Sequence, residues 1–334
     1  MKNTFGSALG LTIFGESHGA GVGAVLDGMA AGVPVDQAAL AALMDKRRAR
    51  GDGLSTARVE ADEIRILSGV VDGHTTGTPI TLLIENHNTR SADYAATAAL
   101  LRPGHADYTA YARYRGFQDA RGGGHFSGRI TAGLVAGGGV VLGALERAGV
   151  RIATHIARCA GLADTPFAQD DPAALAAQLD VLAARGAGFA LLDQSAEAPM
   201  QAAIRAAGSE GDSVGGILET AILGLPAGVG EPFFDSVESV LAHMAFSVPA
   251  VKGIEFGAGF GFADLRGSQA NDPLRIRDGH IYTETNRNAG INGGLANGMP
   301  VVYRTVVKPT PSIYKEQRTV DYKAGENASL SIKG

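Results

Sequence analysis

The stretch Arg121-Gly122-Gly123-Gly124-His125-Phe126-Ser127-Gly128-Arg129 runs directly into a long segment of small, apolar residues that ends at Arg147. This segment has little polar surface and predicts a buried helix over 131–147. Three glycines before a helix N-terminus expose backbone N–H groups at the positive end of the helix dipole, which favours binding of an anion. A flexible linker is the alternative, although a linker has no need for arginine on both sides. The stretch is not a Walker A loop, because its Gly-Lys-Ser/Thr element is missing.

Working outward from this helix, hydrophobic periodicity predicts further elements. A helix begins after Asp36, a suitable N-cap, and ends in the basic run Lys46-Arg47-Arg48-Ala49-Arg50-Gly51, which carries more positive charge than a helix C-terminus requires. No G-x-G-x-x-G motif follows a first strand, so antiparallel sheets with packed helices, an α+β fold, fit better than a parallel Rossmann sheet. The remaining predicted helices span 173–184 and 237–246, and the predicted strands span 22–26, 64–70, 80–85, 214–223 and 301–307.

A short pattern of small residues occurs twice in the chain at an offset of 196, after an apolar strand and before a helix each time. It is compatible with a duplicated sheet-and-helix unit, and equally with chance. The first set is Gly28, Ala31, Gly32 and Val33, and the second is Gly224, Ala227, Gly228 and Val229.

Bulk composition narrows the class of protein. The 334 residues are 45% hydrophobic and 19% charged, enough for a large core, and the net charge of −5 gives no sign of nucleic-acid binding. A single cysteine, Cys159, excludes a disulfide framework. The N-terminus lacks the pattern of a signal peptide, and the longest uncharged run, 130–145, is shorter than the roughly 20 residues of a membrane span. We therefore expect a cytoplasmic protein with no membrane and no nucleic-acid partner.

Three other segments place reactive side chains between turn-forming residues. Gly15-Glu16-Ser17-His18-Gly19 presents a Ser–His pair, or is a turn with an incidental histidine. In Arg102-Pro103-Gly104-His105-Ala106-Asp107, the arginine can grip a phosphate or carboxylate, or simply pair with Asp107. Lys308-Pro309-Thr310-Pro311-Ser312 offers an ammonium group and hydroxyls for a second phosphate, or is a proline turn that ends a strand. No metal-ligand spacing or G-x-S-x-G elbow occurs, so we expect neither a transition-metal site nor a serine hydrolase.

Taken together and in this order, these segments resemble the chorismate synthase family over about residues 5 to 334. Three further motifs join them: Gly211-Asp212-Ser213-Val214-Gly215-Gly216, Ala250-Val251-Lys252-Gly253 and Asn292-Gly293-Gly294. The resemblance implies a lyase of the shikimate pathway. Its reaction is the anti-1,4-elimination of phosphate from 5-enolpyruvylshikimate 3-phosphate, which gives chorismate and requires reduced FMN. It also implies helices sandwiched between antiparallel sheets, and assembly as a homotetramer.

The resemblance further implies roles for individual residues. His18, with Ser17 beside it, would protonate or stabilise the leaving phosphate, and His105 and Ser127 would complete the catalytic set. Substrate anions would be bound by Arg47, Arg102 and Arg129, and Arg47 also matches a position assigned to NADP. The residues matching the family's FMN site are His125, Phe126, Ser127, Pro249, Ala250, Gly293, Lys308, Pro309, Thr310, Pro311 and Ser312.

The chain departs from the family pattern in several places. Many members have Arg-Ser-Ser where His125-Phe126-Ser127 stands, and an Arg where Gly53 stands. The family continues with an Arg-His-Asp-Pro-Cys segment, whereas this chain ends at Ile332-Lys333-Gly334, so we expect one domain over 1–334 that lacks that segment. A non-catalytic homologue that binds flavin or phosphate is therefore the alternative to a working lyase. Without a dinucleotide fingerprint, NADPH would act as an indirect reductant, through a separate flavin reductase.

Overall fold

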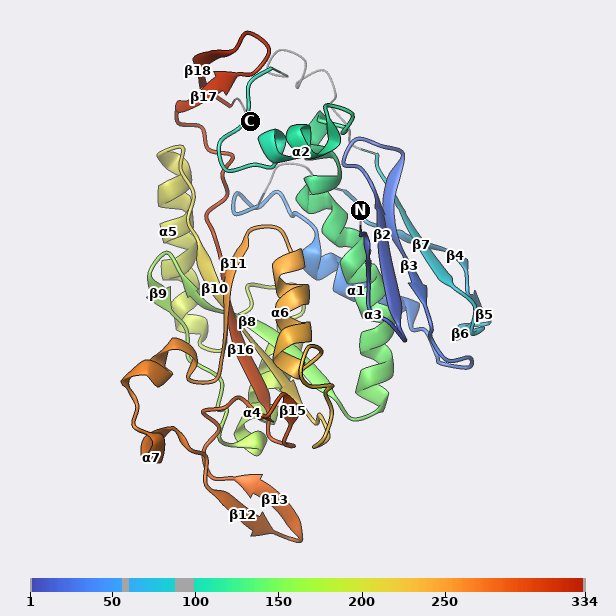
Figure 1. The fold of residues 1–334 in the computed structure, drawn as a ribbon, viewed down its shortest axis with the longest axis vertical. Coiled ribbons are helices and arrows are strands. Elements are labelled where there is room, and N and C mark those ends of the chain that lie inside the picture. The colour runs from blue at the N-terminus through green and yellow to red at the C-terminus, as the bar shows by residue number, and fades with distance from the viewer. Residues whose placement is uncertain (1, 56–59, 88–98, 333–334) are drawn as a thin grey trace. The chain divides into compact units, whose positions relative to one another are not determined.

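The structure, a computed structural model, describes residues 2–55, 60–87 and 99–332. The chain divides into two compact units, and each contains its own antiparallel sheet (Figure 1). The first unit consists of the chain up to Ala144, together with Arg205–Ser213 and the part from Pro311 onward. The second unit consists of Leu145–Ile204 and Val214–Thr310.

The first unit is built on an antiparallel sheet with the strand order β1-β2-β3-β7-β4. These strands span Thr4–Phe5 (β1), Gly10–Gly15 (β2), Gly21–Asp27 (β3), Ile80–Glu85 (β7) and Ile64–Ser68 (β4). Two small hairpins are added, β5 (Val70–Val71) with β6 (His74–Thr75), and β17 (Gln317–Asp321) with β18 (Glu326–Leu330). The helices are α1 (Gln37–Arg47), α2 (Asp107–Tyr114), α3 (Thr131–Arg147) and the short 3-10 helices η2 (Arg121–Phe126) and η3 (Gly128–Ile130).

The core of this unit lies between the sheet and two helices. Alternate residues of β3 and β7 point inward, and their side chains are almost completely buried, as expected for a sheet with one covered face. Leu40 and Met44 of α1 pack into the same cluster. The start of α1 was predicted correctly, because the Asp36 carboxylate accepts hydrogen bonds from the amides of Ala38 (2.9 Å) and Ala39 (3.0 Å).

Helix α3 approaches its neighbours through glycines. A Cβ at Gly133 would lie 2.5 Å from the carbonyl oxygen of Gly23 in β3, and one at Gly139 would lie 2.6 Å from Leu40 of α1. Residues Gly128–Arg147 are long and apolar enough to cross a membrane by length and composition alone. Their packing against the sheet and α1 instead makes α3 a core helix, as the sequence predicted.

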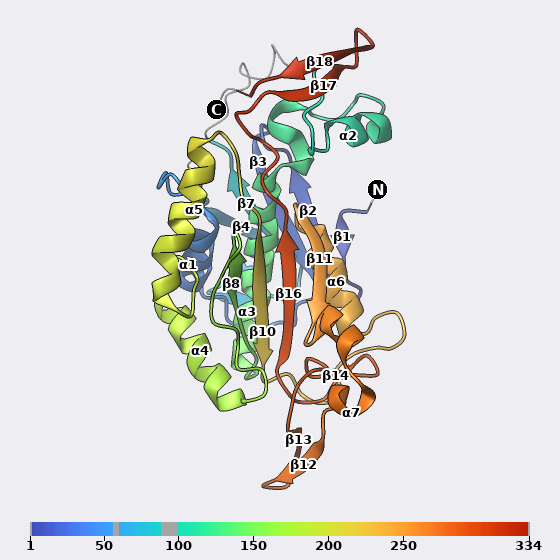
Figure 2. The same ribbon diagram turned by 90° about the vertical axis from the view of Figure 1, so that its left-hand side faces the viewer.

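The second unit contains another antiparallel sheet, with the strand order β11-β16-β10-β8-β9. Figure 2 shows its two central strands, β10 and β16, side by side. The strands span Val251–Phe256 (β11), Val301–Val307 (β16), Gly216–Leu223 (β10), Arg151–Cys159 (β8) and Leu162–Ala163 (β9). The α-helices are α4 (Pro172–Ala184), α5 (Glu197–Ser209, which continues into the first unit), α6 (Val237–Ser247) and α7 (Gly267–Ala270), and the 3-10 helices are η4 (Gln194–Ala196) and η5 (Gly259–Asp264). Its hairpins are β12 (Leu274–Arg277) with β13 (His280–Thr283), and β14 (Ile291–Asn292) with β15 (Leu295–Ala296).

The two units share a topology, which favours duplication over chance for the short repeated pattern. In each sheet a central strand, β3 or β10, is followed by an eleven-residue helix, α1 or α6, then by an edge strand, a short hairpin and the strand that pairs beside the central one. In the second unit, η5, α7 and the β12–β13 hairpin are inserted between the edge strand and the β14–β15 hairpin. The glycines of the repeated pattern make equivalent contacts. The Gly32 amide donates to the carbonyl of Thr75 (2.7 Å) in the first hairpin, and the Gly228 amide donates to that of Ala296 (2.8 Å) in the second. The α+β prediction with antiparallel sheets is confirmed.

The close approach of α3 gives a test on a single helix. We expect Gly133→Ala to lower the free energy of unfolding by about 1–3 kcal/mol, because the new methyl group meets backbone that cannot move aside. The matched control is Gly138→Ala, whose Cβ would meet nothing within 4 Å and which we expect to be neutral or stabilising by up to about 1 kcal/mol. Urea denaturation of both variants measures the two changes in the free energy of unfolding. Equal changes would contradict the close packing of Gly133 against β3.

Candidate active site

The glycine loop is the centre of the candidate site. Gly122, Gly123 and Gly124 all have positive φ angles (59°, 83° and 53°), so the chain there adopts a conformation that other residues rarely reach. A Cβ at Gly122 would lie 2.2 Å from Cε1 of His18, and one at Gly123 would lie 3.7 Å from Nη2 of Arg102. Two of the predicted site residues therefore lie against successive glycines of this loop.

Backbone and side-chain hydrogen bonds tie the glycine loop to the loop that carries Ser17 and His18. The Ser17 amide donates to the carbonyl of Gly124 (3.1 Å), and Nδ1 of His125 lies 2.8 Å from the carbonyl oxygen of Gly15. Because a carbonyl oxygen only accepts, this contact places the His125 proton on Nδ1. Ser17 is buried and His18 is half-buried. Two segments that the sequence predicted separately thus form one structure.

Arg102 is oriented by an ion pair with Asp107, the first residue of α2. Nε and Nη2 of Arg102 donate to the two carboxylate oxygens (2.8 and 2.7 Å), and the Arg102 amide adds a third hydrogen bond (2.9 Å). Burial raises the pKa of Asp107, but the hydrogen bonds and charge of Arg102 outweigh it, so this pKa lies below the ordinary 3.8. The Arg–Asp pair considered from the sequence is therefore present, and it holds the guanidinium beside Gly123.

His105 is held by the segment that follows residue 310. Its Nε2 atom lies 2.9 Å from Oγ of Ser312. That segment is anchored in turn, since the Tyr314 amide donates to the carbonyl of Gly211 (2.9 Å) and Nζ of Lys315 pairs with Asp212 (2.7 Å). The contact unites His105, predicted to be catalytic, with Ser312, predicted to bind the cofactor.

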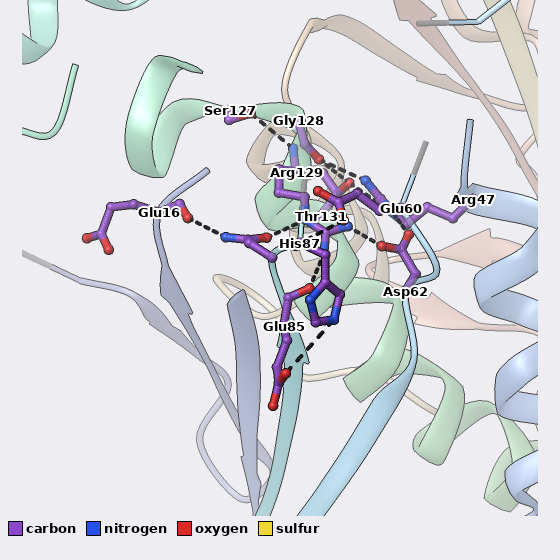
Figure 3. A network of polar contacts seen from close by, with 11 residues as sticks. Glu16, Arg47, Glu60, Asp62, Glu85, His87, Ser127, Gly128, Arg129 and Thr131 are labelled. Carbon is purple, nitrogen blue, oxygen red and sulfur yellow. Dashed lines mark hydrogen bonds and ion pairs between the residues drawn. The ribbon is translucent and has the colours of Figure 1, made fainter. Parts of the chain in front are cut away.

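The other two predicted arginines meet at a carboxylate that sequence analysis missed. Nη1 of Arg47 and Nη1 of Arg129 each donate to one oxygen of Asp62, whose side chain is completely buried (Figure 3). Arg47 also lies within hydrogen-bonding distance of Thr131 Oγ1 (3.4 Å) and the Gly128 carbonyl (3.5 Å), at the start of α3. The surplus of positive charge at the end of α1 indicated that a carboxylate must lie nearby, but it did not indicate that this carboxylate is Asp62.

Asn86 was missed as well. Its side-chain oxygen accepts from Nε of Arg129 (2.9 Å), and its Nδ2 donates to the carbonyls of Glu16 and Gly19 (3.0 Å each). Arg129 also donates to the carbonyl of Glu85 (3.2 Å). One side chain thus joins Arg129 to the Ser17–His18 loop, and this residue directly follows β7.

The residues that match the family's FMN site fall into separate groups. Phe126 is 42% exposed and lies edge-on to Tyr114, with 5.9 Å between ring centroids, while Ser127 caps η3 by accepting from the Arg129 amide (3.2 Å). In the second unit, the Lys308 amide donates to the carbonyl of Ala250 (3.0 Å), so 249–250 and 308–310 are neighbours.

Gly293 does not join that neighbourhood in the second unit. It lies in the turn between β14 and β15, which precedes β16, whereas Lys308 directly follows β16. At about 3.3 Å per residue, this strand separates the two positions by roughly 20 Å.

The Arg102–Asp107 pair gives a pH-dependent test. Because the folded-state pKa of Asp107 is lowered, its stabilisation is present above pH 3.8 and is lost as the pH falls through the lowered value. We expect Asp107→Asn to lower the free energy of unfolding by about 1–3 kcal/mol at neutral pH, and by progressively less as the pH falls below 3.8. Denaturant unfolding over a series of pH values measures this, and the exposed Asp264→Asn is a control that we expect to change little at any of them. A pH-independent loss for Asp107→Asn would contradict the assignment.

The chain is similar to known proteins in both sequence and structure. Residues 9–334 match the family model described as chorismate synthase. Chorismate synthases of Dehalococcoides mccartyi and Methanosarcina barkeri are 44% and 45% identical, over 100% and 99% of this chain and 90% and 88% of their own lengths. A crystal structure of chorismate synthase has a TM-score of 0.75 and 27% identity, over 91% of this chain and 84% of that one. The chain belongs to the chorismate synthase family.

Proposed function

We propose that this protein eliminates phosphate from 5-enolpyruvylshikimate 3-phosphate to form chorismate, as a lyase of the shikimate pathway that depends on reduced FMN. Family membership supports the reaction class and a phosphorylated small-molecule substrate. The observation that carries the proposal is the placement of His18 and Arg102 against successive glycines of one loop. A non-catalytic scaffold has no physical need for a titratable group and an oriented cation at such a place.

The chemistry assigns a task to each group. The C–O bond to phosphate breaks while a ring carbon loses a proton, so negative charge develops on the departing phosphate. A histidine side chain can donate a proton or a hydrogen bond, so His18 would serve the departing phosphate in this way, with Ser17 beside it. Arg47, Arg102 and Arg129 would bind the substrate's phosphate and carboxylates. Arg129 uses three of its five N–H groups within the described protein and its side chain is only 5% exposed, so it would contact substrate through the remaining N–H groups alone.

The side chains proposed to hold FMN have chemistry that suits this cofactor. Lys308, Thr310 and Ser312 supply an ammonium group and hydroxyls suited to a phosphate, and exposed Phe126 offers a ring for a flat ligand. Gly293 also matches the family's FMN site, but it lies at the opposite end of β16 from Lys308, so it is left out of this donor set. His125, Ser127, Pro249, Ala250, Pro309 and Pro311 complete the residues that would hold the cofactor. Reduced FMN, when bound, supplies transient electron density that eases the loss of phosphate.

His105 would hold and move a proton beside this cofactor, and its hydrogen bond with Ser312 sets the orientation of the imidazole ring. Ser127 completes the proposed catalytic set. NADPH would serve as an indirect reductant through a separate flavin reductase, and Arg47 is the position proposed to contact NADP. We further propose that the enzyme acts in the cytoplasm as a homotetramer.

An anaerobic assay tests the function. The protein is mixed with pre-reduced FMN and the enolpyruvyl substrate, and chorismate is followed by its absorbance. Formation of chorismate supports the lyase. FMN binding without any turnover would favour the non-catalytic homologue instead.

Both histidines have a direct test in the same assay. We expect His18→Ala and His105→Ala each to lower turnover by roughly 10² to 10⁴, the usual contribution of a general acid–base group. His280→Ala, which removes an exposed histidine from β13, serves as the control and should retain wild-type turnover. Wild-type rates in both site variants would refute the assignment.

The glycine loop can be tested without removing a reactive group. A methyl group at Gly122 would collide with the His18 ring, so Gly122→Ala should displace the ring and lower turnover by up to about 10², the cost of a small misplacement. Gly73→Ala is the control, because Gly73 has a similar φ of 72° but a Cβ there meets nothing within 4 Å. Both variants place alanine at a positive φ angle and therefore carry the same kind of backbone strain. Only Gly122→Ala adds a collision with the His18 ring, so only this variant should lose activity. Equal turnover in the two would contradict the close approach of Gly122 to His18.

A further inference from the structure

Asp62 is held where a carboxylate is costly unless it is paired. Its side chain is completely buried, and its φ of 54° is unusual for a residue other than glycine. Each carboxylate oxygen accepts from a different guanidinium, that of Arg47 from α1 and that of Arg129 from the start of α3. Two cations that would otherwise repel each other are thereby kept side by side (Figure 3).

Asn86 extends this arrangement to the loop that carries His18. Its amide oxygen accepts from Arg129, while its amide nitrogen bridges the carbonyls of Glu16 and Gly19, which flank Ser17 and His18. Its backbone amide adds a hydrogen bond to the carbonyl of Ala20 (3.1 Å). The loop is therefore attached at three carbonyls to one residue that also contacts Arg129.

We propose that Asp62 and Asn86 are positioning residues for the reaction. Asp62 sets the distance and orientation of Arg47 and Arg129 for the substrate's anionic groups. Asn86 holds the loop that carries His18 in a fixed position relative to these two arginines. The proposal rests on the proposed function, since it assigns these arginines and His18 to substrate. An alternative for Asp62 is that its carboxylate competes with the substrate for the same guanidiniums. The two roles predict opposite changes in affinity.

Substrate binding to the protein with oxidised FMN, where turnover does not occur, separates these roles. We expect Asp62→Asn, which keeps the shape but removes the charge, to raise the Kd for 5-enolpyruvylshikimate 3-phosphate about tenfold or more, measured by calorimetry. Glu63→Gln removes the neighbouring exposed carboxylate and should leave the Kd unchanged. Tighter binding by Asp62→Asn, or an unchanged Kd, would overturn the positioning role.

Asn86 should affect the chemical step more than binding. We expect Asn86→Ala to lower kcat about tenfold while KM changes far less, because the loop that presents His18 loses its two side-chain attachments. Asn271→Ala, at an exposed position of the second unit, is the control. If Asp62→Asn and Asn86→Ala changed kcat and KM in the same way, both substitutions would simply make the structure less ordered, and the proposal would be overturned.

Nuclear magnetic resonance of the arginine Nε–H groups gives a readout that needs no substrate. In the wild-type protein, the Nε–H proton of Arg129 should exchange slowly because it donates to Asn86. Both Asp62→Asn and Asn86→Ala should speed that exchange, and unchanged exchange would overturn the proposal whatever the activity. If the wild-type protein neither binds nor converts the substrate, the proposed function fails, while the exchange data still decide whether Asp62 and Asn86 order Arg129.

Discussion

The close contact between the glycine loop at 122–124 and the loop that carries Ser17 and His18 governs the whole candidate site. Gly122 leaves just enough room for the His18 ring, and the carbonyl of Gly124 receives the Ser17 amide. The same loop leads through Ser127 into α3, which itself can approach the sheet only because Gly133 has no side chain. The position of His18 and the packing of the core helix thus depend on one continuous stretch of the chain.

Charge is organised around that contact by paired groups. Arg102 is oriented by Asp107, while Arg47 and Arg129 share Asp62, so each guanidinium is directed by a carboxylate of the protein. Such pairing keeps cations close together without ligand and limits the reorganisation that ligand binding would require. A protein with a net charge of −5 can in this way present a local site for a phosphorylated substrate.

Much of the fold could be predicted because its signals are local. The predicted helix 131–147 and strand 301–307 match α3 and β16, since each is a mainly apolar segment with clear ends. The predicted strand 64–70 is instead broken at Gly69, where the chain turns with a φ of 82°. The pairing of Asp62 with Arg129 joins positions 67 residues apart, and periodicity carries no information about such a contact. The resemblance named Arg129 and Gly293, but only the folded chain shows that Arg129 is buried and that Gly293 and Lys308 lie at opposite ends of β16.

A crystal structure of the protein with oxidised FMN and 5-enolpyruvylshikimate 3-phosphate would show whether the loops carrying His18, Arg102 and the three glycines receive one anion. We expect the substrate's phosphate to lie within hydrogen-bonding distance of His18, and Arg102 or Arg129 to contact one of its anionic groups. A substrate bound away from the glycine loop, with His18 touching only protein, would contradict this expectation.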